Sequence, residues 1–125
     1  MVNDILLYTG SGVIILWGIA HLIPTKAIID GFGSISEDNK QIIKMEWIAE
    51  GITLCFIGLI VLLITVSVGS QDVASVIVYW MCGMMLVVMA GLSLLTGANT
   101  SIIPIKICPL VKTAVAILFF LASVL

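Results

Sequence analysis

Residues 45–68 read MEWIAEGITLCFIGLIVLLITVSV, and this run decides the class of the protein. Its only charged residues are Glu46 and Glu50. As a helix it would be about 36 Å long, which is enough to cross about 30 Å of hydrocarbon. Over the whole chain of 125 residues, 62% are hydrophobic and 10% are charged, whereas soluble proteins have about 45–50% and about 25%. We therefore expect an integral membrane protein, and the composition excludes soluble enzymes, nucleic-acid-binding proteins and disordered adaptors.

Three further apolar runs predict an all-α bundle of four transmembrane helices with up-down-up-down topology, forming a single domain over residues 1–125. The helices are expected at about residues 4–23, 37–68, 73–95 and 105–125. Pro24 should end the first helix. Ser34 and Ser36 give an N-cap signature for the second helix, which should begin near Glu37, and Asp72 is an N-cap residue for the third. Gly97 and Asn99 should end the third helix. Residues 25–35 are expected to form a loop.

Glycines spaced seven or eight residues apart in the first three helices are expected to allow close helix contact. They are Gly10, Gly18, Gly51, Gly58, Gly83 and Gly91.

The lysines predict the orientation in the membrane, because all of them fall on the side shared by the first and third connections. They are Lys26, Lys40, Lys44, Lys106 and Lys112, and the opposite side has none. Positively charged residues are enriched on the cytoplasmic side of membrane proteins. Both chain termini are therefore expected outside the cytoplasm.

Four ionisable residues lie within predicted spans, namely His21, Glu46, Glu50 and Lys112. Such residues cost about 2.5–3.5 kcal/mol on insertion scales, so each is a candidate functional residue. Because neighbouring helices are antiparallel, all four should converge in one leaflet. Glu46 and Glu50 are one helical turn apart, and two carboxylates in a low dielectric resist joint ionisation. We interpret His21, Glu46 and Glu50 as candidate proton-transfer residues of a polar pocket. The alternative is that all four ionisable residues only mark the membrane boundary, where lysine and glutamate side chains can reach water.

Trp17, Trp47 and Thr53 are the further candidates for lining this pocket, with Lys112, around a flat or hydrophobic ligand such as a quinone or a sterol-like molecule. An interfacial position explains Trp47 equally well. One histidine and two carboxylates are a weak signal for a metal site, and the Glu-x-x-His pair of di-iron bundles is absent. No metal site is predicted, and quinone is the one cofactor considered.

Residues 18–24, Gly-Ile-Ala-His-Leu-Ile-Pro, together with Glu50-Gly51-Ile52-Thr53-Leu54 and Gly58, resemble the DoxX-like family of small four-helix membrane proteins. The resemblance implies a prokaryotic inner-membrane protein, and some members of that family are membrane subunits of quinone-linked oxidoreductases. Only His21, Pro24, Glu50 and Gly51 can be carried over from the family pattern.

Three functions remain open from the sequence. The first is binding of a hydrophobic or redox ligand in the pocket, as a membrane subunit of an oxidoreductase. The second is proton-coupled transport or channel activity, in which the same carboxylates titrate. The third is a structural role, in which the glycine faces dock against a larger membrane complex. The expected partners are the lipid bilayer and either further copies of the chain or the other subunits of a membrane complex.

Overall fold

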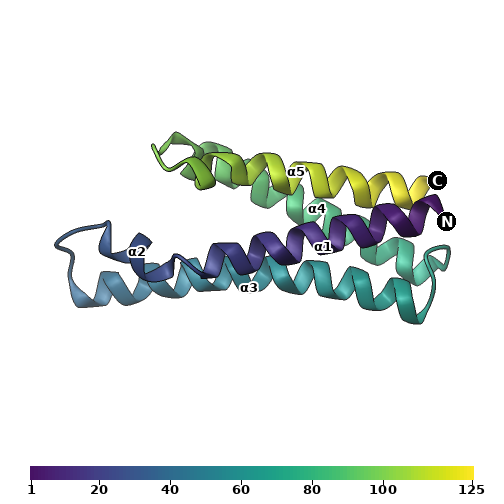
Figure 1. Ribbon diagram of the computed structural model, residues 1–125, viewed down its shortest axis with the longest axis horizontal. Coiled ribbons are helices and arrows are strands. Elements are labelled where there is room, and N and C mark those ends of the chain that lie inside the picture. The colour runs from purple at the N-terminus through teal and green to yellow at the C-terminus, as the bar shows by residue number, and fades with distance from the viewer.

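The computed structural model describes residues 1–125 and consists of helices only. Its four long helices are α1 (Val2–Leu22), α3 (Glu37–Ser67), α4 (Val73–Leu95) and α5 (Ile103–Val124). A short helix α2 (Thr25–Asp30) and a 3-10 turn η1 (Gly97–Asn99) lie in the connections. All four long helices are long and apolar enough to cross a membrane. The predicted all-α, four-helix membrane bundle is confirmed (Figure 1).

The two ends of the bundle differ in charge. Both termini and the turn between α3 and α4 lie at one end, which we call the terminal end (Figure 1). The opposite end, called the lysine end, holds α2, the start of α3 and η1. Lys26 belongs to α2, Lys40 and Lys44 to the start of α3, and Lys106 to the first turn of α5. Lys112 differs from these four, because it is only 1% exposed inside the bundle.

Two of the predicted capping residues form side-chain hydrogen bonds at the start of a long helix. Ser36 accepts a hydrogen bond from the backbone N–H of Asn39 at 3.2 Å, and Asp72 accepts one from the backbone N–H of Ala74 at 2.9 Å. Side-chain oxygens at these positions satisfy N–H groups that have no partner within the helix. The second and third long helices therefore begin where the sequence predicts.

The prediction of a loop over residues 25–35 is wrong in its first half, because residues 25–30 form α2. Pro24 ends α1 as expected but also occupies the N-cap position of this new helix. The hydroxyl of Thr25 donates to the carbonyl of Leu22 at 2.6 Å, which links the two helices. Ile29 is buried, so the short helix is stabilised by packing rather than by its length.

Glycine brings α1 and α3 into close contact, as predicted. A Cβ atom at Gly18 would lie 2.8 Å from the carbonyl oxygen of Gly51, and one at Gly58 would lie 2.8 Å from that of Ser11. Backbones this close leave no room for a side chain. Gly91 differs, because nothing lies within 4 Å of a Cβ added there, so its predicted contact role is wrong.

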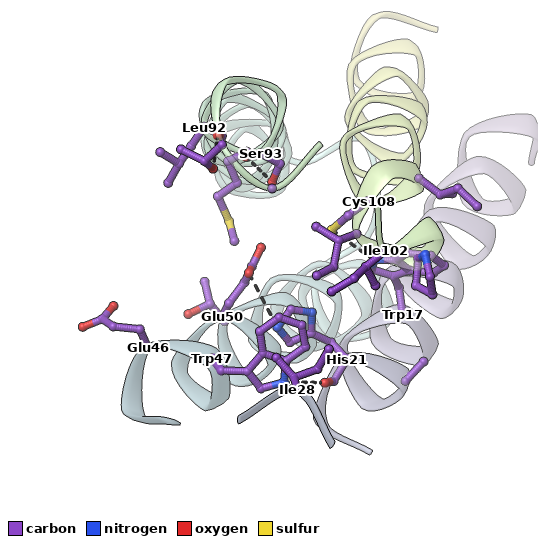
Figure 2. Close-up of a pocket in the computed structure, with 18 of the residues that line it drawn as sticks. Trp17, His21, Ile28, Glu46, Trp47, Glu50, Leu92, Ser93, Ile102 and Cys108 are labelled. Atoms are coloured by element: carbon purple, nitrogen blue, oxygen red, sulfur yellow. Dashed lines mark hydrogen bonds and ion pairs between the residues drawn. The ribbon is translucent and has the colours of Figure 1, made fainter. Parts of the chain in front are cut away.

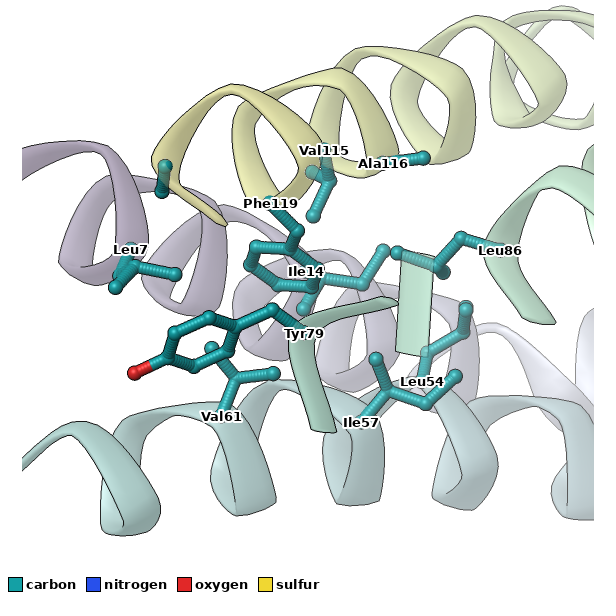
Figure 3. Packing of buried hydrophobic residues seen from close by; sticks show 11 residues of the cluster. Leu7, Ile14, Leu54, Ile57, Val61, Tyr79, Leu86, Val115, Ala116 and Phe119 are labelled. Atoms are coloured by element: carbon teal, nitrogen blue, oxygen red, sulfur yellow. The ribbon is translucent and has the colours of Figure 1, made fainter. Parts of the chain in front are cut away.

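The hydrophobic core is formed by the middle of the four long helices and by their segments nearer the terminal end. Figure 3 shows its side chains meeting between the helices. Eleven buried residues from the four long helices form it: Leu7, Ile14, Leu54, Ile57, Val61, Tyr79, Leu86, Val115, Ala116, Phe119 and Ala122. Toward the lysine end, the α4–α5 pair diverges from the α1–α3 pair (Figure 1). The core therefore leaves the lysine half of the bundle free for a cavity.

Candidate functional site

A cavity of about 1010 Å³ lies where the two helix pairs diverge (Figure 2). Its walls come from all four long helices and from α2. The lining includes Trp17 and His21 of α1, Ile28 of α2, Glu46, Trp47, Glu50 and Thr53 of α3, Met85, Met89, Leu92 and Ser93 of α4, and Ile105 and Cys108 of α5. Most of this wall is apolar, and the charged groups are confined to His21, Glu46 and Glu50.

Lys112 of α5 stands directly behind the cavity wall and is paired with Glu50 of α3. Its ammonium donates a hydrogen bond to a carboxylate oxygen of Glu50 and forms an ion pair with it. The same ammonium donates to the hydroxyl of Ser93 of α4 at 2.9 Å. A buried ammonium is tolerated only when it is paired and hydrogen-bonded. These three residues therefore join α3, α4 and α5 at one point.

His21 approaches the other oxygen of the same carboxylate. Its Nε2 atom lies 3.5 Å from Oε2 of Glu50, which is too far for a good hydrogen bond. This nitrogen is buried and has no hydrogen-bond partner. Glu50 thus lies between an ammonium and an imidazole, and its side chain is 30% exposed toward the cavity.

Trp47 fixes the position of His21. The two rings are stacked, with centroids 3.9 Å apart and planes inclined by 17°. The indole N–H of Trp47 also donates to the backbone carbonyl of His21 at 2.9 Å. The imidazole is therefore held by both a stacking contact and a backbone anchor, with its Nε2 edge toward Glu50 (Figure 2).

Two other predicted ligand-binding residues have partners within the protein. The indole N–H of Trp17 donates to the sulfur of Cys108 at 3.3 Å, which joins α1 to α5 at the cavity wall. The hydroxyl of Thr53 donates to the carbonyl of Ala49 at 2.7 Å. A ligand would therefore meet these residues through the indole ring and the threonine methyl group rather than through new hydrogen bonds.

The structure places six of the seven predicted site residues on the cavity wall, and the seventh, Lys112, contacts one of them. Glu46 is separated from the others: it is exposed and makes no ion pair or hydrogen bond, although it lies one helical turn from Glu50. The alternative in which Lys112 reaches water at the membrane boundary does not apply, because its side chain is only 1% exposed. Ser93 was missed, although a serine within an apolar helix near the same end is a signal that could have identified it.

No three histidine, cysteine or carboxylate side chains lie close enough together to hold a metal ion. No family model, curated protein or solved structure matches the chain. The resemblance to the DoxX-like family therefore stays a prediction. The chain is a small integral membrane protein, and its function must be argued from this cavity.

Proposed function

We propose that the protein binds a hydrophobic small molecule with a carbonyl or hydroxyl oxygen, of the quinone class, in the cavity at the lysine end. The observation that carries this proposal is the Nε2 atom of His21, which is buried at the cavity wall without a hydrogen-bond partner. Buried polar atoms are almost always hydrogen-bonded, so one without a partner needs an explanation. An oxygen atom of a bound ligand would supply the missing partner once the Glu50 side chain, whose Oε2 lies 3.5 Å from this nitrogen, moves aside to expose it.

The size and lining of the cavity support a ligand with a flat head and an apolar body. Ligand pockets commonly enclose about 300–1,000 Å³, with mostly apolar walls and a few polar groups that fix orientation. This cavity reaches the top of that range. Its polar groups are concentrated around His21 and Glu50, whereas Met85, Met89 and Leu92 offer flexible apolar surface on the opposite wall.

The ion pair of Glu50 and Lys112 is suited to exchange a proton with such a ligand as it is reduced. The carboxylate contacts the ammonium of Lys112 with one oxygen and faces His21 with the other. Glu46 lies one turn nearer the lysine end and is exposed, so it offers an intermediate step toward water. We assign His21 to binding the ligand oxygen. The hydrogen-bonded pair of Lys112 and Glu50 would donate a proton when a partner subunit supplies the electrons that reduce the quinone, and Glu46 would replace that proton from the cytoplasmic solution. A role as the membrane subunit of an oxidoreductase fits this arrangement.

The alternative of a proton-coupled transporter receives less support from the core. Leu54, Ile57 and Leu86 belong to the packed core between the cavity and the terminal end, and none of them is more than 4% exposed. A pathway across the membrane would require this packed region to open. One-sided binding requires no such change.

Binding is best tested on the full chain in lipid nanodiscs with decylubiquinone as the probe. Trp17 and Trp47 line the cavity, so their fluorescence should be quenched by the bound quinone. Trp80 packs against Phe120 outside the cavity, and a Trp80→Phe background removes its signal. In that background, His21→Phe keeps an aromatic ring against Trp47 but removes the nitrogen.

We expect His21→Phe to raise the Kd for decylubiquinone at least tenfold, which corresponds to the loss of about 1.4 kcal/mol. Ser11→Ala is the matched control, because Ser11 is another buried residue of α1 whose polar atom has no partner, but it lies outside the cavity. It should leave the Kd unchanged. Equal quenching in the His21→Phe variant and the parent would contradict the proposal. Quinone-independent, pH-driven flux in liposomes would favour the transporter instead.

A further inference from the structure

A second pocket lies at the lysine end, between α2 and the first two turns of α3, and is separate from the quinone-class cavity. Its volume is about 570 Å³, and we call it the interfacial pocket. Three lysines line it: Lys26 from α2, and Lys40 and Lys44 from α3. None of the three forms an ion pair within the protein.

The pocket also contains two carboxylates, Asp30 and Glu37. One oxygen of Glu37 already accepts a hydrogen bond from the side-chain amide of Gln41 at 2.8 Å. Three ammonium groups against two carboxylates leave the pocket with a net positive charge. Because the lysines carry no ion pair, that charge is available to an anion from outside the protein.

The length of α3 places this pocket at the level of the lipid headgroups. The helix has 31 residues, so it is about 46 Å long, whereas the hydrocarbon of a bilayer is about 30 Å thick. The helix ends at Ser67 beside the turn at the terminal end, so roughly its first ten residues extend beyond the hydrocarbon on the other side. Lys40 and Lys44 lie within these residues, one turn apart.

The pocket has an apolar side as well as a charged side. Ile23 and Ile29 line it next to the lysines. Ile23 is 78% exposed, and Phe32, in the following turn, is 50% exposed. An inorganic anion would gain nothing from these apolar side chains, whereas an amphiphile with a phosphate group and acyl chains would contact both sides.

We propose that the interfacial pocket binds the phosphate headgroup of an anionic phospholipid in the leaflet at the lysine end. Lys26, Lys40 and Lys44 contact the phosphate as point charges, and the exposed side chain of Ile23 contacts the upper part of the acyl chains. Lysine binds phosphate in this way without needing the fixed geometry of an arginine fork. The site differs from a general attraction to a charged surface because α2 and α3 bring the three lysines into one recess.

The test uses the full chain in a nonionic detergent, titrated with dihexanoyl-phosphatidylglycerol, dihexanoyl-phosphatidylcholine and sodium phosphate. We expect phosphatidylglycerol to bind at least tenfold more tightly than either of the other two probes. Each of Lys26→Gln, Lys40→Gln and Lys44→Gln should weaken its binding about fivefold, in line with the usual contribution of one basic residue near an anionic surface. Glu37→Gln should strengthen it, because one competing carboxylate is removed.

Lys106→Gln is the matched control, because Lys106 is exposed at the same end of the bundle but lines neither pocket. It should change the Kd less than twofold. An equal loss in Lys106→Gln and Lys40→Gln would overturn the site in favour of a diffuse surface charge. Sodium phosphate binding as tightly as phosphatidylglycerol would overturn the lipid assignment in favour of a free-anion site. Helical content measured by circular dichroism confirms that each variant is folded.

Discussion

Replacement of Glu50 by glutamine should destabilise the protein, because the buried ammonium of Lys112 would lose its charged partner. Lys112 is 1% exposed, and Glu50 is its only charged partner within hydrogen-bond distance. Removing one partner of a buried ion pair usually costs about 3–5 kcal/mol. Glu50 itself is 30% exposed to the cavity, and Ser93 still accepts a hydrogen bond from the ammonium. We therefore expect a loss at or below the lower end of that range, about 2–3 kcal/mol.

The measurement is the free energy of unfolding in mixed micelles of a mild detergent and dodecyl sulfate, followed by circular dichroism. The double variant Glu50→Gln/Lys112→Met removes both charges and should recover most of the stability, because an apolar side chain of similar length replaces the ammonium. The double-mutant cycle should give a coupling free energy of about 1.5 kcal/mol or more.

Glu46→Gln serves as the control in the same assay, since this exposed carboxylate lies one turn away and has no partner. Its effect should be below about 0.5 kcal/mol. A coupling free energy below about 0.5 kcal/mol between Glu50 and Lys112 would refute the reasoning, because it would mean that the two side chains do not share one buried pair.

Three further changes test the packing in the same unfolding assay. Gly18→Ala should cost about 1–3 kcal/mol of stability, because the added methyl group meets the backbone of α3. Gly12→Ala is the control and should be neutral or slightly stabilising, because nothing lies within 4 Å of the new atom. Equal effects of the two substitutions would contradict the close contact between α1 and α3. Tyr79→Phe should cost about 0.5–1.5 kcal/mol, because the buried tyrosine hydroxyl lies 2.8 Å from that of Thr65; no loss would show that this bond is not formed. Asn3→Ala should cost about 1 kcal/mol, because its amide donates at 3.0 Å to a carbonyl in the last turn of α5; unchanged stability would place the N-terminus free of that helix.

The four spans could be predicted from the sequence because hydropathy and capping residues are local signals. Ser36 and Asp72 stand immediately before the helices they cap, so the boundaries of α3 and α4 required no tertiary information. The helix α2 could not be predicted in this way. Its six residues are too few to form a stable helix alone, and the burial of Ile29 that stabilises it depends on the tertiary packing.

The candidate site could be predicted in its membership but not in its geometry. The expected depth of His21, Glu50 and Lys112 along their helices places them in one half of the membrane. In the structure, the cavity and the pair of Glu50 and Lys112 lie in that half. Depth does not give the rotation of each helix about its axis. Glu46 and Glu50 lie one turn apart on the same predicted helix, so the sequence does not distinguish them. Only Glu50 contacts Lys112, because this contact depends on a residue 62 positions away along the chain. The partnership of Ser93 depends on the same long-range packing.

The pairing of Lys112 with Glu50 also bears on how the chain is made. The helix α5 enters the membrane carrying a lysine that costs about 2.5–3.5 kcal/mol on insertion scales, and the carboxylate that neutralises this lysine belongs to α3, which is synthesised earlier. Docking of α5 against α3, which pairs the two charges, therefore stabilises the inserted helix. In a variant that lacks Glu50, α5 would be less stable in the membrane and more accessible to membrane proteases. We therefore expect the first visible defect to be a low abundance of the protein in cells.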